Sequence, residues 1–296
     1  MMGMEFEALL DGNLSDKYHY IKFVNDYEDG EWRYEKLQNF IGDSLLLTAL
    51  SEKERSALIA DLKIETIRTE SIKKLRTGLL KNKAEGSELG EICLYGIMRS
   101  HYNALPIVPK IFYKQNSNDY AKGADSVHLI LTDSDFEIWL GESKFYNDLD
   151  KAFSAALDSI LEMLDTDKLK KESSIITNLS ELSYFRNEKL TKNMIESINK
   201  ILSFNSSIDE LKKRLHIPIF LMYECSLTKK STDLNMCRSE LKKVSFDKIE
   251  KYKLQLEKKL EVIYNFHEIC FHVILFPIPE KEPIRQWFIE DFSKGK

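Results

Sequence analysis

The sequence predicts an α/β fold whose core runs helix, three strands, helix, strand. Two apolar arms flank a turn between residues 127 and 146, which indicates a β-hairpin. Residues 218–223 and 270–276 form almost wholly apolar runs, as expected of strands that are covered on both faces. Segments around these strands carry apolar residues at helical spacing, so helices should pack on the sheet.

The chain is long enough for one large α/β domain or two smaller ones, at 296 residues. Its hydrophobic content of 43% is typical of a globular protein. No internal repeat or low-complexity linker interrupts it. We therefore expect residues 1–80 to form an N-terminal α/β elaboration packed on the core. Residues 81–296 should form that core, with further helices and strands toward the C-terminus.

Several elements are expected before the hairpin. In chain order they are a strand at 19–25, helices at 35–50, 52–62 and 87–101, and a strand at 109–114. Ser51 should cap the second helix, because a serine hydroxyl accepts a hydrogen bond from a free N–H of the first turn.

A second series of elements follows the hairpin. Asn147 or Asp148 should cap a helix that runs to about residue 164. Pro277 and Pro279 should end the last strand. The other expected elements are helices at 189–202, 208–215, 246–264 and 285–292, in addition to the two apolar strands.

The hairpin places charged residues at the end of an apolar surface. In the register that pairs Thr132 with Asp135, Asp125 lies opposite Glu142. Cross-strand partners have Cβ atoms about 4.5–5.5 Å apart, so two carboxylates would repel each other there. Lys144 lies two residues after Glu142 and so shares its face of the strand. A divalent cation bound by oxygen ligands would relieve the repulsion.

These residues resemble the site of a known nuclease superfamily. An Asp, about sixteen residues, and then Glu-x-Lys at the end of an apolar strand is typical of PD-(D/E)xK nucleases. The segments Gly-Ala-Asp-Ser-Val-His, Gly-Glu-Ser-Lys-Phe-Tyr and the upstream Gly-Ser-Glu-Leu-Gly-Glu are similar to the HamA family, the nuclease subunits of Hachiman anti-phage systems. Ala124 stands where the superfamily name has Pro, a position with no required chemistry.

The resemblance implies a fold and a chemistry. The fold would be α/β, with a restriction-endonuclease-like αβββαβ core and helical elaborations at both ends. Asp125 and Glu142 would bind Mg²⁺ or Mn²⁺, with the main-chain carbonyl of Ser143 as a third ligand. Bound metal activates water and neutralises charge during phosphodiester hydrolysis. Lys144 would orient the water or hold the scissile phosphate.

The superfamily also often uses a helix glutamate. Glu88 and Glu91 lie one turn apart on the helix expected at 87–101. A carboxylate at Glu88 is favoured by the helix dipole whatever its function. Glu91 flanks the apolar face, so it is the preferred residue to bind metal directly or through water, with Glu88 as the alternative.

Composition bounds the setting of this activity. No apolar run approaches the roughly 20 residues of a membrane helix, and no secretory signal is visible. The four cysteines have no close pairs, which favours reduced thiols in the cytoplasm over a zinc site. The net charge of −5 neither supports nor excludes DNA binding, because binding can use a local basic surface.

In the hairpin register, His128 points to the face opposite the carboxylates, across from Trp139. His272 lies in an apolar strand, so both histidines should be structural.

Two functions fit these observations. The first is a metal-dependent deoxyribonuclease, the effector of a bacterial anti-phage complex. By resemblance, a superfamily 2 helicase subunit similar to HamB would restrain it and load DNA. The chain has no Gly-rich phosphate loop of its own, so it should not consume ATP. The alternative is a catalytically silent DNA-binding or scaffold subunit of a helicase complex.

Overall fold

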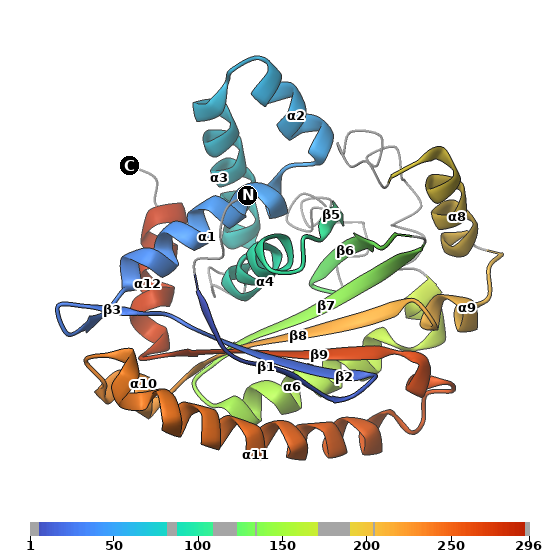
Figure 1. Cartoon of the computed structure of the whole chain (residues 1–296). Coiled ribbons are helices and arrows are strands. Elements are labelled where there is room, and N and C mark those ends of the chain that lie inside the picture. Colours follow the sequence, from blue (N-terminus) through green and yellow to red (C-terminus); the bar gives the residue numbers. More distant parts are fainter. Residues whose placement is uncertain are drawn as a thin grey trace.

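A computed structural model of the chain describes residues 6–81, 88–108, 123–133, 135–170, 190–203 and 205–293. These residues form an α/β structure around a seven-stranded mixed sheet (Figure 1), as the sequence predicts. The strand order is β1-β2-β9-β8-β7-β6-β5. The strands are β1 (Glu7–Ser15), β2 (Tyr18–Val24), β5 (Leu105–Val108), β6 (Ser126–Leu131), β7 (Phe136–Tyr146), β8 (Leu215–Glu224) and β9 (Cys270–Ile278).

The sheet changes direction at both edges. Strands β2, β9, β8 and β7 are parallel to one another. The edge pairs β1–β2, β6–β7 and β5–β6 are antiparallel. A separate two-stranded ribbon is formed by β3 (Tyr27–Glu28) and β4 (Glu31–Trp32). Four parallel strands in the middle of the sheet explain why 218–223 and 270–276 lack polar alternation.

Helices cover both faces of the sheet (Figure 1), and on each face a separate apolar core lies between the helices and the strands. On one face lie α1 (Tyr34–Ala49), α4 (Glu88–Ser100) and α12 (Lys281–Ser293). On the other lie α6 (Leu149–Met163), α8 (Lys192–Leu202) and the long α11 (Leu234–Leu260). The remaining helices of the described residues are α2 (Glu52–Ala60), α3 (Ile64–Lys81), α9 (Ile208–Lys212), α10 (Ser226–Lys230) and the 3₁₀ turn η2 (Phe266–Glu268).

The predicted hairpin and its register are confirmed. The main-chain N–H of Thr132 donates to Asp135 O at 2.9 Å, and Ser126 pairs with Gly141. His128 lies opposite Trp139, as expected. Alternation along β7 then sends Leu140 into the core under α6 and Trp139 into the core under α4.

Both predicted helix caps are also confirmed. Ser51 and Glu54 form a reciprocal capping box at the start of α2. Of the two candidates before α6, Asp148 is the cap, and its Oδ1 accepts from Lys151 N at 2.8 Å. Local side-chain chemistry therefore sets both helix starts.

Other predictions differ from the structure. Pro277 does not end the last strand, because β9 continues to Ile278. The pairing of β2 with β9 stops at Leu275, so the missing N–H of Pro277 costs no ladder bond on that side.

Helix α11 begins at Leu234, well before the expected position 246. Strand β1 and helix α3 were not among the elements predicted from the sequence. The strand expected at 109–114 lies outside the described residues, whereas β5 precedes it.

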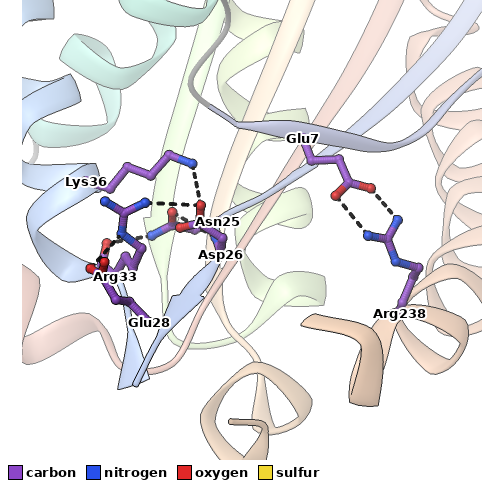
Figure 2. Close-up of polar contacts among 7 residues, drawn as sticks. All are labelled: Glu7, Asn25, Asp26, Glu28, Arg33, Lys36 and Arg238. Atoms are coloured by element: carbon purple, nitrogen blue, oxygen red, sulfur yellow. Dashed lines mark hydrogen bonds and ion pairs between the residues drawn. The ribbon is translucent and has the colours of Figure 1, made fainter. Parts of the chain in front are cut away.

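The N-terminal segment joins the sheet through β2, which pairs with β9. Figure 2 shows one polar contact that attaches this segment to α11 and one polar cluster within the segment. Glu7 of β1 forms an ion pair with Arg238 of α11. Asp26, just after β2, accepts from Lys36 at 2.9 Å and from Arg33 at 3.3 Å. The division between residues 80 and 81 stays a prediction.

The composition also led to expectations about membrane-spanning helices and about the cysteines. Within them, no helix combines the length and the apolar character needed to cross a bilayer. All four cysteines are free thiols, as expected.

Candidate functional site

The hairpin brings Asp125 next to β7. Asp125 N donates to Gly141 O at 2.8 Å, which extends the β6–β7 pairing by one residue. Oδ2 of Asp125 accepts two hydrogen bonds from Ser143, from the main-chain N at 2.9 Å and from Oγ at 3.0 Å. Asp125, Glu142 and Ser143 are therefore neighbours, as the register predicts.

Glu142 and Lys144 form an ion pair on the face of the sheet covered by α6. Their neighbours along that face are Leu140 on β7 and Ile219 on β8, both in the core under α6. The Glu142 side chain is 5% exposed and the Lys144 side chain 20% exposed. The Glu142 side chain is thus almost removed from water, while the Lys144 side chain keeps some exposed surface.

The surroundings of Glu142 make its negative charge costly. Burial, followed by the nearby charge of Asp125, raises the pKa of Glu142 to about 8. Lys144, and to a smaller extent Ser159, only partly offset these effects. Burial lowers the pKa of Lys144, but the charges of Glu142 and Asp125 outweigh it, so the net shift is upward. An additional cation beside Glu142 would stabilise the charged form of this carboxylate.

Ser159 is a site residue that the sequence analysis missed. It lies on α6, near enough to Glu142 to help lower the pKa of that carboxyl. The available signal was helical spacing, because Ser159 lies three residues after the buried Ala156 and next to the buried Ile160. That spacing places it at the flank of the inner face of α6.

The helix carboxylates approach the site from the other face. Glu88 and Glu91 both lie in the first turn of α4 and are 2% and 5% exposed. Gly90 lies between them, and a Cβ added there would meet Ser143 Oγ at 3.3 Å. The first turn of α4 therefore packs on β7 at Ser143, while Glu142 faces α6. The choice of Glu91 over Glu88 stays a prediction.

The oxygen atoms present fit a hard divalent cation held by few protein ligands. Among the described residues, no three His, Cys, Asp or Glu side chains are grouped so as to hold a metal. Glu91 therefore does not join Asp125 and Glu142 in one such group in this structure. Mg²⁺ commonly takes one or two carboxylates and keeps several waters. Asp125, Glu142 and the Ser143 carbonyl could supply such a set. The raised pKa of Glu142 shows that its negative charge is destabilised, and a cation bound beside it would stabilise that charge.

The histidines take structural positions. His128 is fully buried beside the ring of Tyr95, and burial lowers its pKa to about 3. Neither ring nitrogen of His128 has a hydrogen-bond partner within the described part of the chain. His272 is buried in β9, and its Nε2 lies 2.9 Å from Nδ1 of His216. His272 is thus a partnered core residue, as expected.

A comparison with protein families extends these observations to the whole chain. The HamA family model matches residues 5–292, a range that contains every candidate site residue. No curated protein matches the chain. Because the match covers nearly the full length, the chain belongs to the HamA family, whose members are components of Hachiman anti-phage defence.

Proposed function

We propose that this protein is a Mg²⁺-dependent DNA nuclease, the effector of a bacterial anti-phage complex. One observation carries the proposal: Glu142, a buried carboxylate with a pKa of about 8, lies beside Asp125 and is paired with Lys144. An ordinary exposed Glu–Lys pair contributes roughly 0–1 kcal/mol and needs no second carboxylate. Burying one acid next to a second, half-buried acid with a single base is costly unless the site serves a bound cation.

The element order supports a restriction-endonuclease-like core. Helix α4 is followed by β5, β6 and β7, then by α6, and later by β8. The two helices cover opposite faces of the sheet, and β8 is parallel to β7. The proposed site lies on the second and third of these strands. Residues before α4 and after β8 are then the elaborations.

Each residue has a proposed role. Asp125 and Glu142 would hold the cation together with the Ser143 carbonyl, and Glu91, on the other face, would contribute through water. Bound Mg²⁺ lowers the pKa of a water and neutralises charge on the phosphate. Ser143 Oγ and N orient Asp125, and the nearby Ser159 favours the charged form of Glu142. Lys144, partly exposed beside Glu142, orients the attacking water or binds a phosphate oxygen.

A helicase partner completes the proposed complex. Family membership supports a defence setting, and the sequence has no phosphate-binding loop of its own. We infer that a superfamily 2 helicase similar to HamB supplies the motor, restrains the nuclease and loads DNA in the cytoplasm.

Plasmid cleavage tests the proposal. The purified chain is incubated with supercoiled DNA in Mg²⁺ or EDTA, alone and with its helicase. We expect Mg²⁺-dependent cutting that falls by about 10²-fold or more in Lys144→Ala and in Glu142→Ala. Lys229→Ala is a matched control, because Lys229 forms an exposed ion pair with Glu280 outside the site. Equal cutting by all four proteins would refute the assignment.

The alternative is a DNA-binding or scaffold subunit without catalysis. It predicts that the chain with its helicase binds plasmid in both Mg²⁺ and EDTA but never cuts it. Cleavage that requires Glu142 and Lys144 excludes this alternative.

A further inference from the structure

Tyr146 lies at the end of β7 and beside the proposed site. It follows Lys144 by two residues, so its side chain leaves the strand on the same face as Glu142 and Lys144. The corresponding Cα atoms are about 6.6 Å apart along the strand. The Tyr146 hydroxyl is close enough to contribute to the raised pKa of Lys144.

Tyr146 is unusually exposed for a strand residue. Within the described part of the chain, eight large hydrophobic residues are exposed, and Tyr146 is the one that lies in the seven-stranded sheet. It is 37% exposed, whereas its partner on β8, Tyr223, is 6% exposed. Tyr146 therefore does not fill the core, although its neighbours on the same strand do.

A lysine supports this ring from α12. Lys281 Nζ lies 5.6 Å from the centre of the Tyr146 ring. The same ammonium donates to Phe145 O at 2.7 Å, and Lys281 N donates to Glu224 Oε1 at 2.7 Å. These two bonds fix Lys281 at the ends of β7 and β8. The ring thus has an anchored cation on one side and exposed surface for a ligand.

We propose that Tyr146 stacks on a nucleobase of the strand whose phosphate lies at Lys144, so that the site prefers DNA with unpaired bases. This inference rests on the proposed nuclease function and specifies its substrate. Aromatic side chains stack on any base, because every base has a π-face, so the contact needs no particular sequence. In a duplex the neighbouring pairs cover the base faces, so a side chain can stack only on a base that has left the helix.

Direct binding measurements test the inference. Fluorescence anisotropy in EDTA, where metal-dependent cutting is absent, measures binding of labelled oligo(dT) and of its duplex with oligo(dA). We expect Tyr146→Ala to weaken single-strand binding by about 5- to 100-fold, and Tyr146→Phe to keep most of it. Duplex binding should change much less.

Tyr264 provides a matched control. It is also exposed, at 74%, and Lys212 Nζ lies 5.9 Å from its ring, but it is in the segment after α11. Tyr264→Ala should therefore bind oligo(dT) like the wild type.

The outcomes separate this inference from the nuclease proposal. Wild-type protein that cuts DNA, together with unchanged oligo(dT) binding by Tyr146→Ala, overturns the stacking role and leaves the nuclease. Binding that depends on Tyr146 without any Mg²⁺-dependent cutting supports stacking and overturns the nuclease. Equal losses in Tyr146→Ala and Tyr264→Ala would also overturn the inference.

Discussion

Asp125 and Ser143 are joined by two hydrogen bonds to a single carboxylate oxygen, one from the main chain and one from the hydroxyl. This arrangement occupies Oδ2 and fixes the direction of the side chain. It also separates two roles of Asp125 that different substitutions can test. One is the acceptor that holds the hairpin end, and the other is the negative charge offered to a cation.

Substituting Asp125 should distinguish these roles. Asp125→Asn keeps an acceptor oxygen, so the free energy of unfolding should change by less than about 1 kcal/mol, while affinity for Mn²⁺ or Mg²⁺ falls. Asp125→Ala removes the acceptor as well and should cost about 1–3 kcal/mol. Chemical denaturation in EDTA and metal titration calorimetry give the two quantities. Unchanged metal affinity in Asp125→Asn would reject Asp125 as a ligand.

Glu142 and Lys144 should be coupled in a way that depends on pH. In Lys144→Met the pKa of Glu142 should rise further above its value of about 8, because the ammonium paired with it is lost. At neutral pH the carboxyl can stay protonated, so the cost is small. At higher pH the folded state must keep a proton that the unfolded state releases, and the cost grows.

A double-mutant cycle with Glu142→Gln measures this coupling. The cost of Lys144→Met should be clearly larger at about pH 9 than at about pH 7 in the parent. In the Glu142→Gln background the cost should be the same at both values, because position 142 can no longer ionise. Denaturation in EDTA keeps metal from contributing. A pH-independent cost in the parent protein would contradict the pairing.

The local part of the site could be predicted from the sequence. The turn from Thr132 to Asp135 sets the register of the hairpin, and register then places Asp125 next to Glu142. The alternation of β7 put Lys144 on the face of Glu142 for the same reason. These relations involve neighbouring segments, so one turn is enough to fix them.

The contributions of distant segments could not be predicted. Ser159 and Lys281 reach the strand from α6 and α12, and their positions depend on how those helices pack on the sheet. Helix packing also decides the place of Glu91, because α4 covers the face opposite Glu142. The charged composition of α11 gave no apolar pattern that would indicate its start. In the structure Asp233 is the N-cap of this helix, and its side chain accepts a hydrogen bond from Asn235 N. Sequence patterns assign a face to a residue, but packing decides what that face meets.

Two helical glycines should respond in opposite ways to alanine. A Cβ on Gly96 of α4 would lie 2.1 Å from Ser44 Oγ and 2.5 Å from Phe40 Cζ on α1, so overpacking should cost about 1–3 kcal/mol. Gly42 of α1 has no such neighbour within 4 Å. Gly42→Ala should stabilise by roughly 0.5–1 kcal/mol through helix propensity. Urea denaturation compares the two. A neutral Gly96→Ala would show that α1 and α4 pack less closely.

The stacked histidines at the start of the parallel strands should make the fold sensitive to acid. Burial first, then the charges of His19 and Lys17, lowers the pKa of His216 to about 4. Burial and the neighbouring histidines hold the pKa of His272 well below 6.5. Between those values and 6.5 the unfolded chain binds protons that the folded chain does not. The free energy of unfolding should therefore fall as pH drops through about 6.5 toward 4, on the order of 2 kcal/mol for His216.

This effect is best measured in the Glu142→Gln variant, because the raised pKa of Glu142 gives the opposite slope, with stability lost as pH rises. His272→Phe keeps a ring against Trp139 and His19 but removes one titrating group. We expect its stability to depend less steeply on pH between about 4.5 and 6.5 than that of the parent. Equal slopes would mean that folding does not lower the pKa of His272, which would contradict a buried, neutral imidazole at this position.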